Sequence, residues 1–212
     1  PANLGGLSLY NLVINKAAQA NTVTSTAALT VTNSLSLTRG TWAAASYSHS
    51  IAGGWNSSAA AFSFSCGTST ISMSSPTPTL TTKGIGTDPF YALSLANGAS
   101  LATDVQSTNS LTISSATLSL GGKNLSVGAN LSGAGALTAS ASEAITVGGN
   151  WNISTFTPAS STLSFSGGSP QSLSGASSFY NLSLSKSAGT LTLATAISVS
   201  NNLTLTSGTL DV

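Results

Sequence analysis

The chain has 212 residues, of which 41% are hydrophobic and only 4% are charged, and its formal net charge is +1. Soluble domains usually carry ~25% charged residues. So few charges exclude the basic surface that binds a nucleic-acid backbone, and no apolar run approaches the ~18 residues of a membrane-spanning helix. We therefore expect no nucleic-acid partner and no membrane span.

Residues 1–8 lead into the first copy of a motif that the rest of the chain repeats. The copies begin at Leu9, Phe90 and Phe179, which are 81 and then 89 residues apart. Internal repeats at a fixed order of features are typical of solenoids and arrays. The repeat-motif residues are Leu9, Tyr10 and Asn11 in the first copy, Phe90 and Tyr91 in the second, and Phe179, Tyr180 and Asn181 in the third.

Each copy is followed by pairs of apolar residues with one small residue between the two members. After the third copy these pairs are Leu182 and Leu184, Leu191 and Leu193, Ile197 and Val199, Leu203 and Leu205, and Leu210 and Val212. Strict alternation predicts short strands with one buried face. Ser and Thr, which make up 71 of the 212 residues, fill the remaining positions, and we interpret them as the solvent-facing half of the strands.

Strands of this length and spacing predict an all-β fold, a parallel β-helix whose expected hand is right-handed. Three strands and three turns use about 18–24 residues, which gives roughly ten coils. The alternative is a row of tandem β-sandwich domains, since the repeat length also suits one sandwich. The third block, residues 179–212, is too short for a sandwich with its own core. We therefore predict one β-solenoid domain over residues 1–212.

Two stretches are less regular, residues 43–62 and residues 74–89, and the second contains Pro76 and Pro78. Because proline cannot donate to a ladder, we expect residues 74–89 to leave the coil as a loop. Trp55 and Trp151 lie in a repeated Gly-Gly-Trp or Gly-Gly-Asn-Trp context and are predicted to be packing elements. Trp42 lies outside that context, which makes it the candidate surface platform for stacking on a ligand.

The sequence offers little catalytic chemistry. His49 is the only histidine and is expected on the surface or in a turn, and the four acidic residues are scattered. A glycosidase needs two facing carboxylates, and a metal site needs a cluster of ligands. Cys66 is the only cysteine, so the chain cannot form an internal disulfide. We predict no enzymatic activity, no catalytic or metal-binding residues and no cofactor.

The order of motifs after residue 147 resembles the repeats of bacterial surface and secreted β-solenoid proteins. The chain is similar there to filamentous-haemagglutinin-like and autotransporter-like adhesin stalks. The resemblance covers most of 148–212 and, more loosely, 1–147, and it implies a solenoid fold and an extracellular or cell-surface location. The motifs that carry it are 148–151 (Gly-Gly-Asn-Trp), 161–167 (Ser-Thr-Leu-Ser-Phe-Ser-Gly), 170–175 (Pro-Gln-Ser-Leu-Ser-Gly), 179–182 (Phe-Tyr-Asn-Leu) and 203–211.

The two ends of the sequence show no capping element. Residues 1–8 have no charge, and residues 203–212 are still in the alternating Leu-x-Leu pattern. Uncapped strand edges pair with other strands, so we expect Leu4, Leu7, Leu210 and Val212 to form an end-to-end contact between copies. The competing explanation is that residues 1–212 are a segment of a longer solenoid, in which case the neighbouring coils belong to the same chain. The expected function is a structural fibre or surface stalk built by self-assembly. The alternative is an adhesin or carbohydrate-binding module that contacts surface glycans through exposed aromatic residues.

Overall fold

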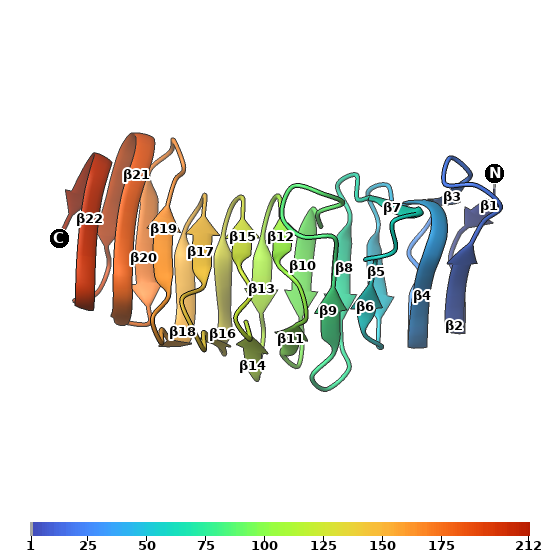
Figure 1. Ribbon diagram of the computed structural model, residues 1–212, viewed down its shortest axis with the longest axis horizontal. Coiled ribbons are helices and arrows are strands. Elements are labelled where there is room, and N and C mark those ends of the chain that lie inside the picture. Colours follow the sequence, from blue (N-terminus) through green and yellow to red (C-terminus); the bar gives the residue numbers. More distant parts are fainter. Residues whose placement is uncertain (1) are drawn as a thin grey trace.

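The structure is a computed structural model that describes residues 2–212, so Pro1 lies outside the described residues. The chain forms one elongated β-solenoid of about 10 turns. Its two termini lie at opposite ends of the stack (Figure 1). Strand pairings within residues 2–212 are all parallel, which confirms the predicted β-helix and makes the sandwich alternative wrong, because a sandwich is built from antiparallel sheets.

The described residues form 22 strands. The first third contains β1 (Ala2–Leu4), β2 (Ser8–Asn15), β3 (Thr22–Ser25), β4 (Thr30–Ala43), β5 (Ser48–Ile51), β6 (Trp55–Asn56) and β7 (Phe62–Ser65). The middle contains β8 (Thr70–Met73), β9 (Thr79–Thr81), β10 (Ala92–Leu95), β11 (Ala99–Leu101), β12 (Val105–Ser107), β13 (Leu111–Ile113), β14 (Thr117–Ser119) and β15 (Leu125–Val127). The last third contains β16 (Leu131–Thr138), β17 (Ala144–Val147), β18 (Trp151–Thr157), β19 (Thr162–Phe165), β20 (Gln171–Gly175), β21 (Ser178–Leu193) and β22 (Ser198–Asp211).

The strands stack into three parallel sheets, which we call faces 1, 2 and 3 in the order in which the chain visits them. Face 1 contains β5, β8, β10, β13, β20, the first parts of β2, β4, β16 and β18, and the last parts of β21 and β22. Face 2 contains β6, β9, β11, β14, the second parts of β2, β4, β16 and β18, and the first parts of β21 and β22. Face 3 contains β1, β3, β7, β12, β15, β17, β19, the last part of β4, and the middle parts of β21 and β22.

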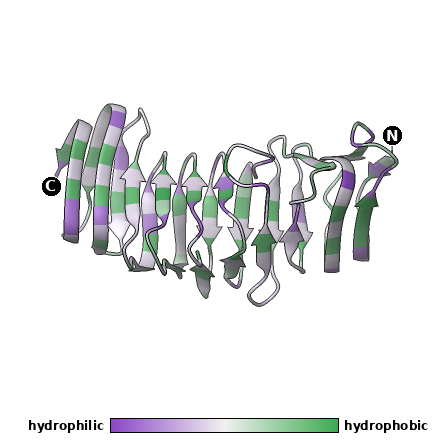
Figure 2. Cartoon of the chain, viewed as in Figure 1, coloured by the Kyte–Doolittle hydropathy of each residue, from purple (hydrophilic) through white to green (hydrophobic). Residues whose placement is uncertain are grey.

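The core is a set of apolar columns, because residues paired in successive coils lie directly above one another. On face 1, Leu93 pairs with Leu111 and Trp151 pairs with Leu173. Their separations of 18 and 22 residues agree with the coil length expected from the sequence. The strand period of two sends the residues between them outward, and β8, β17 and β19 each alternate between buried and partly exposed positions. Figure 2 shows the resulting mixture of hydrophobic and polar positions along the strands.

The expected loop at residues 74–89 is shorter than predicted. Residues 79–81 form β9 on face 2, where β9 pairs with both β6 and β11. The chain leaves the regular coil after this strand, and Phe90 rejoins face 3 through an isolated bridge to Ser107. Pro78 precedes β9, a position at which proline interrupts no ladder bond of that strand.

Candidate functional site: the two open ends

The C-terminal end of the solenoid exposes side chains that in every earlier coil belong to the core. On β22, Leu203 is 49% exposed and Leu205 is 56% exposed, whereas their partners on β21, Leu182 and Leu184, are each 1% exposed. The cause is position alone, because within residues 2–212 only β21 pairs with β22 and no strand covers its other edge. The residues around this open end enclose a shallow, mainly apolar hollow of about 540 Å³, lined by Leu193, Thr195, Ala196, Ile197, Val199, Leu203, Leu210 and Val212.

The N-terminal end is open in a different way. Strand β1 covers β3 on face 3, where Ala2 pairs with Val23 and Leu4 pairs with Ser25. In the same coil, β2 forms faces 1 and 2. One edge of β2 pairs with β4, and no strand of residues 2–212 pairs with its other edge. Leu9 and Leu12 are therefore only partly buried. A hollow of about 610 Å³ lies beside this edge, lined by Ala2, Lys16, Ala20, Asn21 and Thr22.

The four residues expected to form the end-to-end contact lie at these two ends. Leu7 is 39% exposed and Val212 is 92% exposed, while Leu4 and Leu210 are partly buried against the core. Leu4 is the last residue of β1 and Leu7 lies directly before β2, while Leu210 lies near the end of β22 and Val212 directly after it. The structure thus places the expected contact residues in two groups, one at each end.

Trp42 does not lie on the surface, which corrects the expectation that it forms a platform for a ligand. Its side chain is 0% exposed, its indole Nε1 donates to Ser25 Oγ at 2.9 Å, and its ring stacks on Trp55 with centroids 5.8 Å apart. Phe64 and Phe90 complete this aromatic cluster inside the solenoid. The ring therefore offers no free face to a sugar.

His49 is also buried, at 1% exposed, and not on the surface as expected. Its ring lies 5.3 Å from the Trp42 ring. The Leu29 N–H donates to Nδ1 at 3.1 Å, so Nε2 carries the proton and donates to Ala44 O at 3.0 Å. Burial lowers the pKa of His49, despite the opposing effect of the bond to Ala44. The neutral imidazole, which belongs to β5, thus links Leu29 in the β3–β4 connection with Ala44 in the β4–β5 connection.

The repeat-motif residues have structural roles. Trp55 and Trp151 are each buried, as predicted for packing elements. The motif asparagines form a ladder between coils: Asn33 Nδ2 donates to Asn11 Oδ1 and Asn201 Nδ2 donates to Asn181 Oδ1, both at 2.8 Å. An aliphatic or aromatic side chain opens each copy, partly buried at Leu9 and buried at Phe90 and Phe179, and a tyrosine follows each of the three. Tyr91 and Tyr180 are partly buried, while Tyr10 at the open N-terminal edge is 70% exposed.

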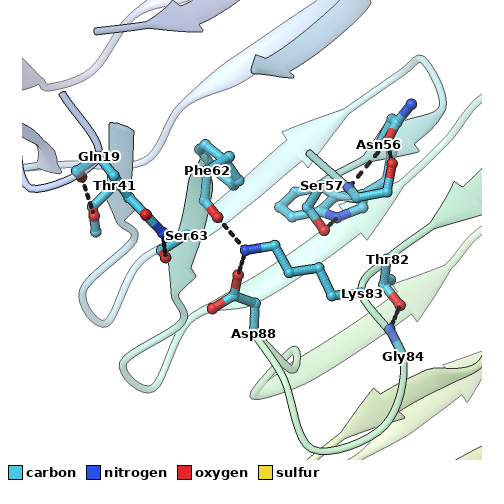
Figure 3. Close-up of polar contacts among 12 residues, drawn as sticks. Gln19, Thr41, Asn56, Ser57, Phe62, Ser63, Thr82, Lys83, Gly84 and Asp88 are labelled. Carbon is cyan, nitrogen blue, oxygen red and sulfur yellow. Dashed lines mark hydrogen bonds and ion pairs between the residues drawn. The ribbon is translucent and has the colours of Figure 1, made fainter. Parts of the chain in front are cut away.

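Two charged groups hold irregular segments in place. Lys83 Nζ lies 2.8 Å from Asp88 Oδ2 and also donates to Phe62 O, so it closes the loop after β9 onto β7 (Figure 3). The buried Glu143 carboxylate accepts bonds from backbone N–H groups of Gly122, Ser140 and Ala141. Burial alone raises the pKa of Glu143, but these bonds outweigh burial and hold the pKa below its usual value.

Lys186 is a buried cation that the sequence did not single out. It is 1% exposed, and its Nζ donates to Gly167 O at 2.9 Å, to Ser169 O at 2.8 Å and to Gln171 Oε1. All three acceptors belong to the coil beneath it, and burial lowers the pKa of Lys186. The signal available in the sequence is that Lys16 and Lys186 each stand seven residues after a motif opening.

Within residues 2–212, no three His, Cys, Asp or Glu side chains come together as a metal site would require. The same residues contain no helix with the length and apolar character needed to span a membrane. No family model matches the chain, and neither the curated proteins nor the solved structures include a match to it. The fold therefore stands on the coil geometry alone.

Proposed function

We propose that this chain is a non-enzymatic structural protein, extracellular or on a cell surface, whose solenoid stacks end to end into a fibre or a stalk. The observation that carries the proposal is the exposure of core-type residues at the C-terminal end, where Leu203 and Leu205 are half exposed. A strand edge with free N–H and C=O groups pairs readily with another strand. Here the edge also presents apolar side chains, so pairing would bury both.

The surface between the ends supports a mechanical role. Only nine residues of the chain are formally charged, and the outward strand positions are largely Ser and Thr. Salt and pH act mainly through charged groups, so such a surface responds weakly to changes outside a cell. The resemblance of the motifs to adhesin stalks supports the same location and the same role.

A stack of this kind is heterologous, because a C-terminal face meets an N-terminal face. Heterologous contacts propagate into open filaments when the rotation between copies does not close a ring. Successive coils here advance along one axis, so each added copy extends the stack (Figure 1). We therefore infer filaments and not rings as the product.

The competing proposal, a glycan-binding module, receives less support. Trp42, Trp55 and Trp151 are all buried. The most exposed aromatic side chain of residues 2–212 is Tyr10. Tyr10 lies on the N-terminal edge that a stacked copy would cover. Micromolar binding to a glycan array that is lost in Tyr10→Ala would favour this alternative.

The decisive experiment compares two aspartate substitutions of equally exposed residues. Leu203 at the open end is 49% exposed, and Ile85 in the loop after β9 is 45% exposed. Burying a charge without a partner costs several kcal/mol, so Leu203→Asp should abolish concentration-dependent assembly in sedimentation velocity and remove rods from negative-stain images. Ile85→Asp should assemble like the wild type. A wild-type chain that stays monomeric at hundreds of micromolar would overturn the proposal.

A further inference from the structure

The first two coils and the last two coils of the solenoid are copies of one structural unit. In both, the alternating apolar segment of the motif (12–14 or 182–184) pairs with a Leu-x-Leu segment (35–37 or 203–205) after a one-residue register shift. Leu12 pairs with Leu35 and Leu182 pairs with Leu203. The coil beneath β21 in the last unit therefore indicates what kind of coil can lie beneath β2 in the first unit.

The two lysines confirm that the units correspond residue by residue. Gly40 follows the first unit with φ 109°, and a Cβ placed there would lie 2.7 Å from Lys16 Cγ. Gly208 follows the second with φ 94°, and its Cβ would lie 2.8 Å from Lys186 Cβ. In both units the glycine leaves room for the lysine stem that passes beneath it. Lys16 is thus the structural counterpart of Lys186.

The surroundings of the two lysines differ in one respect. Lys186 has a coil beneath it, in which the loop between β19 and β20 supplies two backbone oxygen acceptors, Gly167 O and Ser169 O, and Gln171 at the start of β20 supplies a third, Oε1. Lys16 is only partly buried and lines the open hollow of about 610 Å³ at the N-terminal end. That hollow corresponds to the volume that the β19–β20 loop fills beneath Lys186. The N-terminal end is therefore shaped for a coil whose turn presents carbonyl oxygens.

The last coil of a second copy has the required form. Residues 206–209 of β22 connect Leu205 on face 3 to Leu210 on face 1, as the β19–β20 loop connects Phe165 to Gln171 two coils earlier. If β22 lies directly beneath β2, Leu203 stacks under Leu12 and Leu205 under Ile14. The half-exposed Leu203 and Leu205 and the partly buried Leu12 are then covered, and residues 206–209 reach Lys16.

This arrangement requires one exchange of strands. Ala2 in β1 pairs with Val23, and the corresponding pairing in the other unit is Gln171 with Leu191. In the next coil Leu210 pairs with Leu191. Residues 210–212 of an incoming copy and residues 2–4 of the receiving copy therefore compete for the same position on β3.

We propose that, in the end-to-end contact of the proposed fibre, β22 of one copy seats on β2 of the next, its residues 210–212 displace β1 from β3, and Lys16 donates to backbone carbonyls of the 206–209 turn. This inference rests on the proposed assembly and specifies its geometry. Retaining β1 in this rotation is the alternative, and it leaves residues 203–205 of β22 and residues 12–14 of β2 separated by one missing strand, about 10 Å apart at the usual spacing. When β22 of another copy takes the place of β1, the three residue pairs between β1 and β3 are lost. In return, β22 pairs continuously along β2 and β3.

A reversible disulfide that holds β1 on β3 tests the proposed exchange of β1 for residues 210–212 of another copy. Asn3 and Thr24 are Cα partners on β1 and β3, and both point away from the core. In a Cys66→Ala background, Asn3→Cys with Thr24→Cys should form a disulfide that ties β1 down, since paired strands lie within disulfide range. Assembly should disappear on oxidation and return on reduction. Assembly that is equal in both states would overturn the exchange.

A crosslink tests the register. Val13 pairs with Ser36, and its counterpart Ser183 pairs with Thr204. Val13→Cys with Thr204→Cys, again without Cys66, should therefore give a ladder of covalent oligomers on non-reducing gels. The control pair, Val13→Cys with Asn202→Cys, is two residues out of register, about 8 Å between Cα atoms, and should give little crosslinking. Equal ladders, or none from the first pair, would overturn the register.

The lysine is tested by substitution. Lys16→Met keeps the stem but removes the donor, so self-association should weaken about tenfold or more. Lys123→Met, a partly buried lysine far from both ends, should leave self-association unchanged. Wild-type filaments with an unaffected Lys16→Met variant would overturn the role of Lys16 and leave the proposed function standing. Absence of wild-type assembly would overturn the proposed function itself, and with it this contact.

Discussion

The burial of His49 predicts an acid sensitivity that the low charge of the chain does not suggest. Its neutral ring accepts a bond from Leu29 N–H and donates one to Ala44 O. Protonation would place a second N–H against the Leu29 donor and put a charge beside the Trp42 ring. Because burial lowers the pKa of His49 in the folded chain, the unfolded chain takes up the proton first as the pH falls.

The sign and size of the effect follow from this difference in pKa. The free energy of unfolding should be constant above pH 6.5, the usual value for histidine, and should fall as the pH falls below it. The loss continues until the folded-state pKa is reached. One proton changes stability by at most about 1.4 kcal/mol per pH unit, so the loss between pH 6.5 and 5.0 can reach about 2 kcal/mol. Glu143 acts below pH 4.5, outside this window.

The assay is urea unfolding followed by tryptophan fluorescence at several pH values, for the wild type and for His49→Gln. Glutamine carries an acceptor and a donor but does not titrate between pH 5.0 and 6.5. We expect the wild-type midpoint to fall with pH and the variant midpoint to stay level, although the variant is less stable at pH 7.5. Equal pH dependence in both proteins would refute this role of His49.

Three further predictions test the core and the coil contacts. Glu143→Gln should cost about 1–3 kcal/mol at pH 7, since its amide would turn a donor toward backbone donors, and its stability below pH 4.5 should depend less on pH than that of the wild type in urea titrations. Gly133→Ala should lower the melting temperature far more than Gly122→Ala, because a Cβ at Gly133 lies 1.9 Å from Ile113 O whereas nothing lies within 4 Å at Gly122. Leu131→Ala should cost about 2–5 kcal/mol in urea unfolding, because the side chain is 0% exposed and a cavity would remain.

The fold could be predicted because one local rule governs every coil. Alternating apolar residues specify strands with one buried face, and polar residues between short strands specify turns, so the pairs after Phe179 were enough to infer three-sided coils. The rule also placed Leu182, Leu184 and Leu191 in the core, where each is at most 1% exposed. It failed for Leu203 and Leu205 because burial needs a covering coil, and a sequence pattern does not show which coil is the last.

The positions of Trp42 and His49 could not be predicted because their partners come from other coils. Ser25 and Trp55, which contact Trp42, are 17 and 13 residues away in the sequence. No periodicity links these positions. Lys186 was missed for a similar reason, since its acceptors are mostly backbone oxygens, which any sequence supplies. A buried cation held by carbonyl groups has no signature in side-chain composition.

The three copies of the motif begin on three different faces, and this bears on how the ends can meet. Leu9 lies on face 1, Phe90 on face 3 and Phe179 on face 2, because 81 and 89 residues are not whole numbers of coils. A motif that is tolerated on each face shows that the three faces are nearly interchangeable for apolar stacking. Apolar contacts alone would then allow two stacked ends three rotations. The choice among them must come from features that occur at one place in the coil, and at these ends those are the asparagine ladder and the proposed contact between Lys16 and residues 206–209 of another copy. In an unrotated stack, each face of one copy would continue as the same face of the next copy. A stack that matches both features instead places face 3 of β22 against face 2 of β2. Each copy is therefore rotated by one face relative to the last, and successive copies should follow a screw axis.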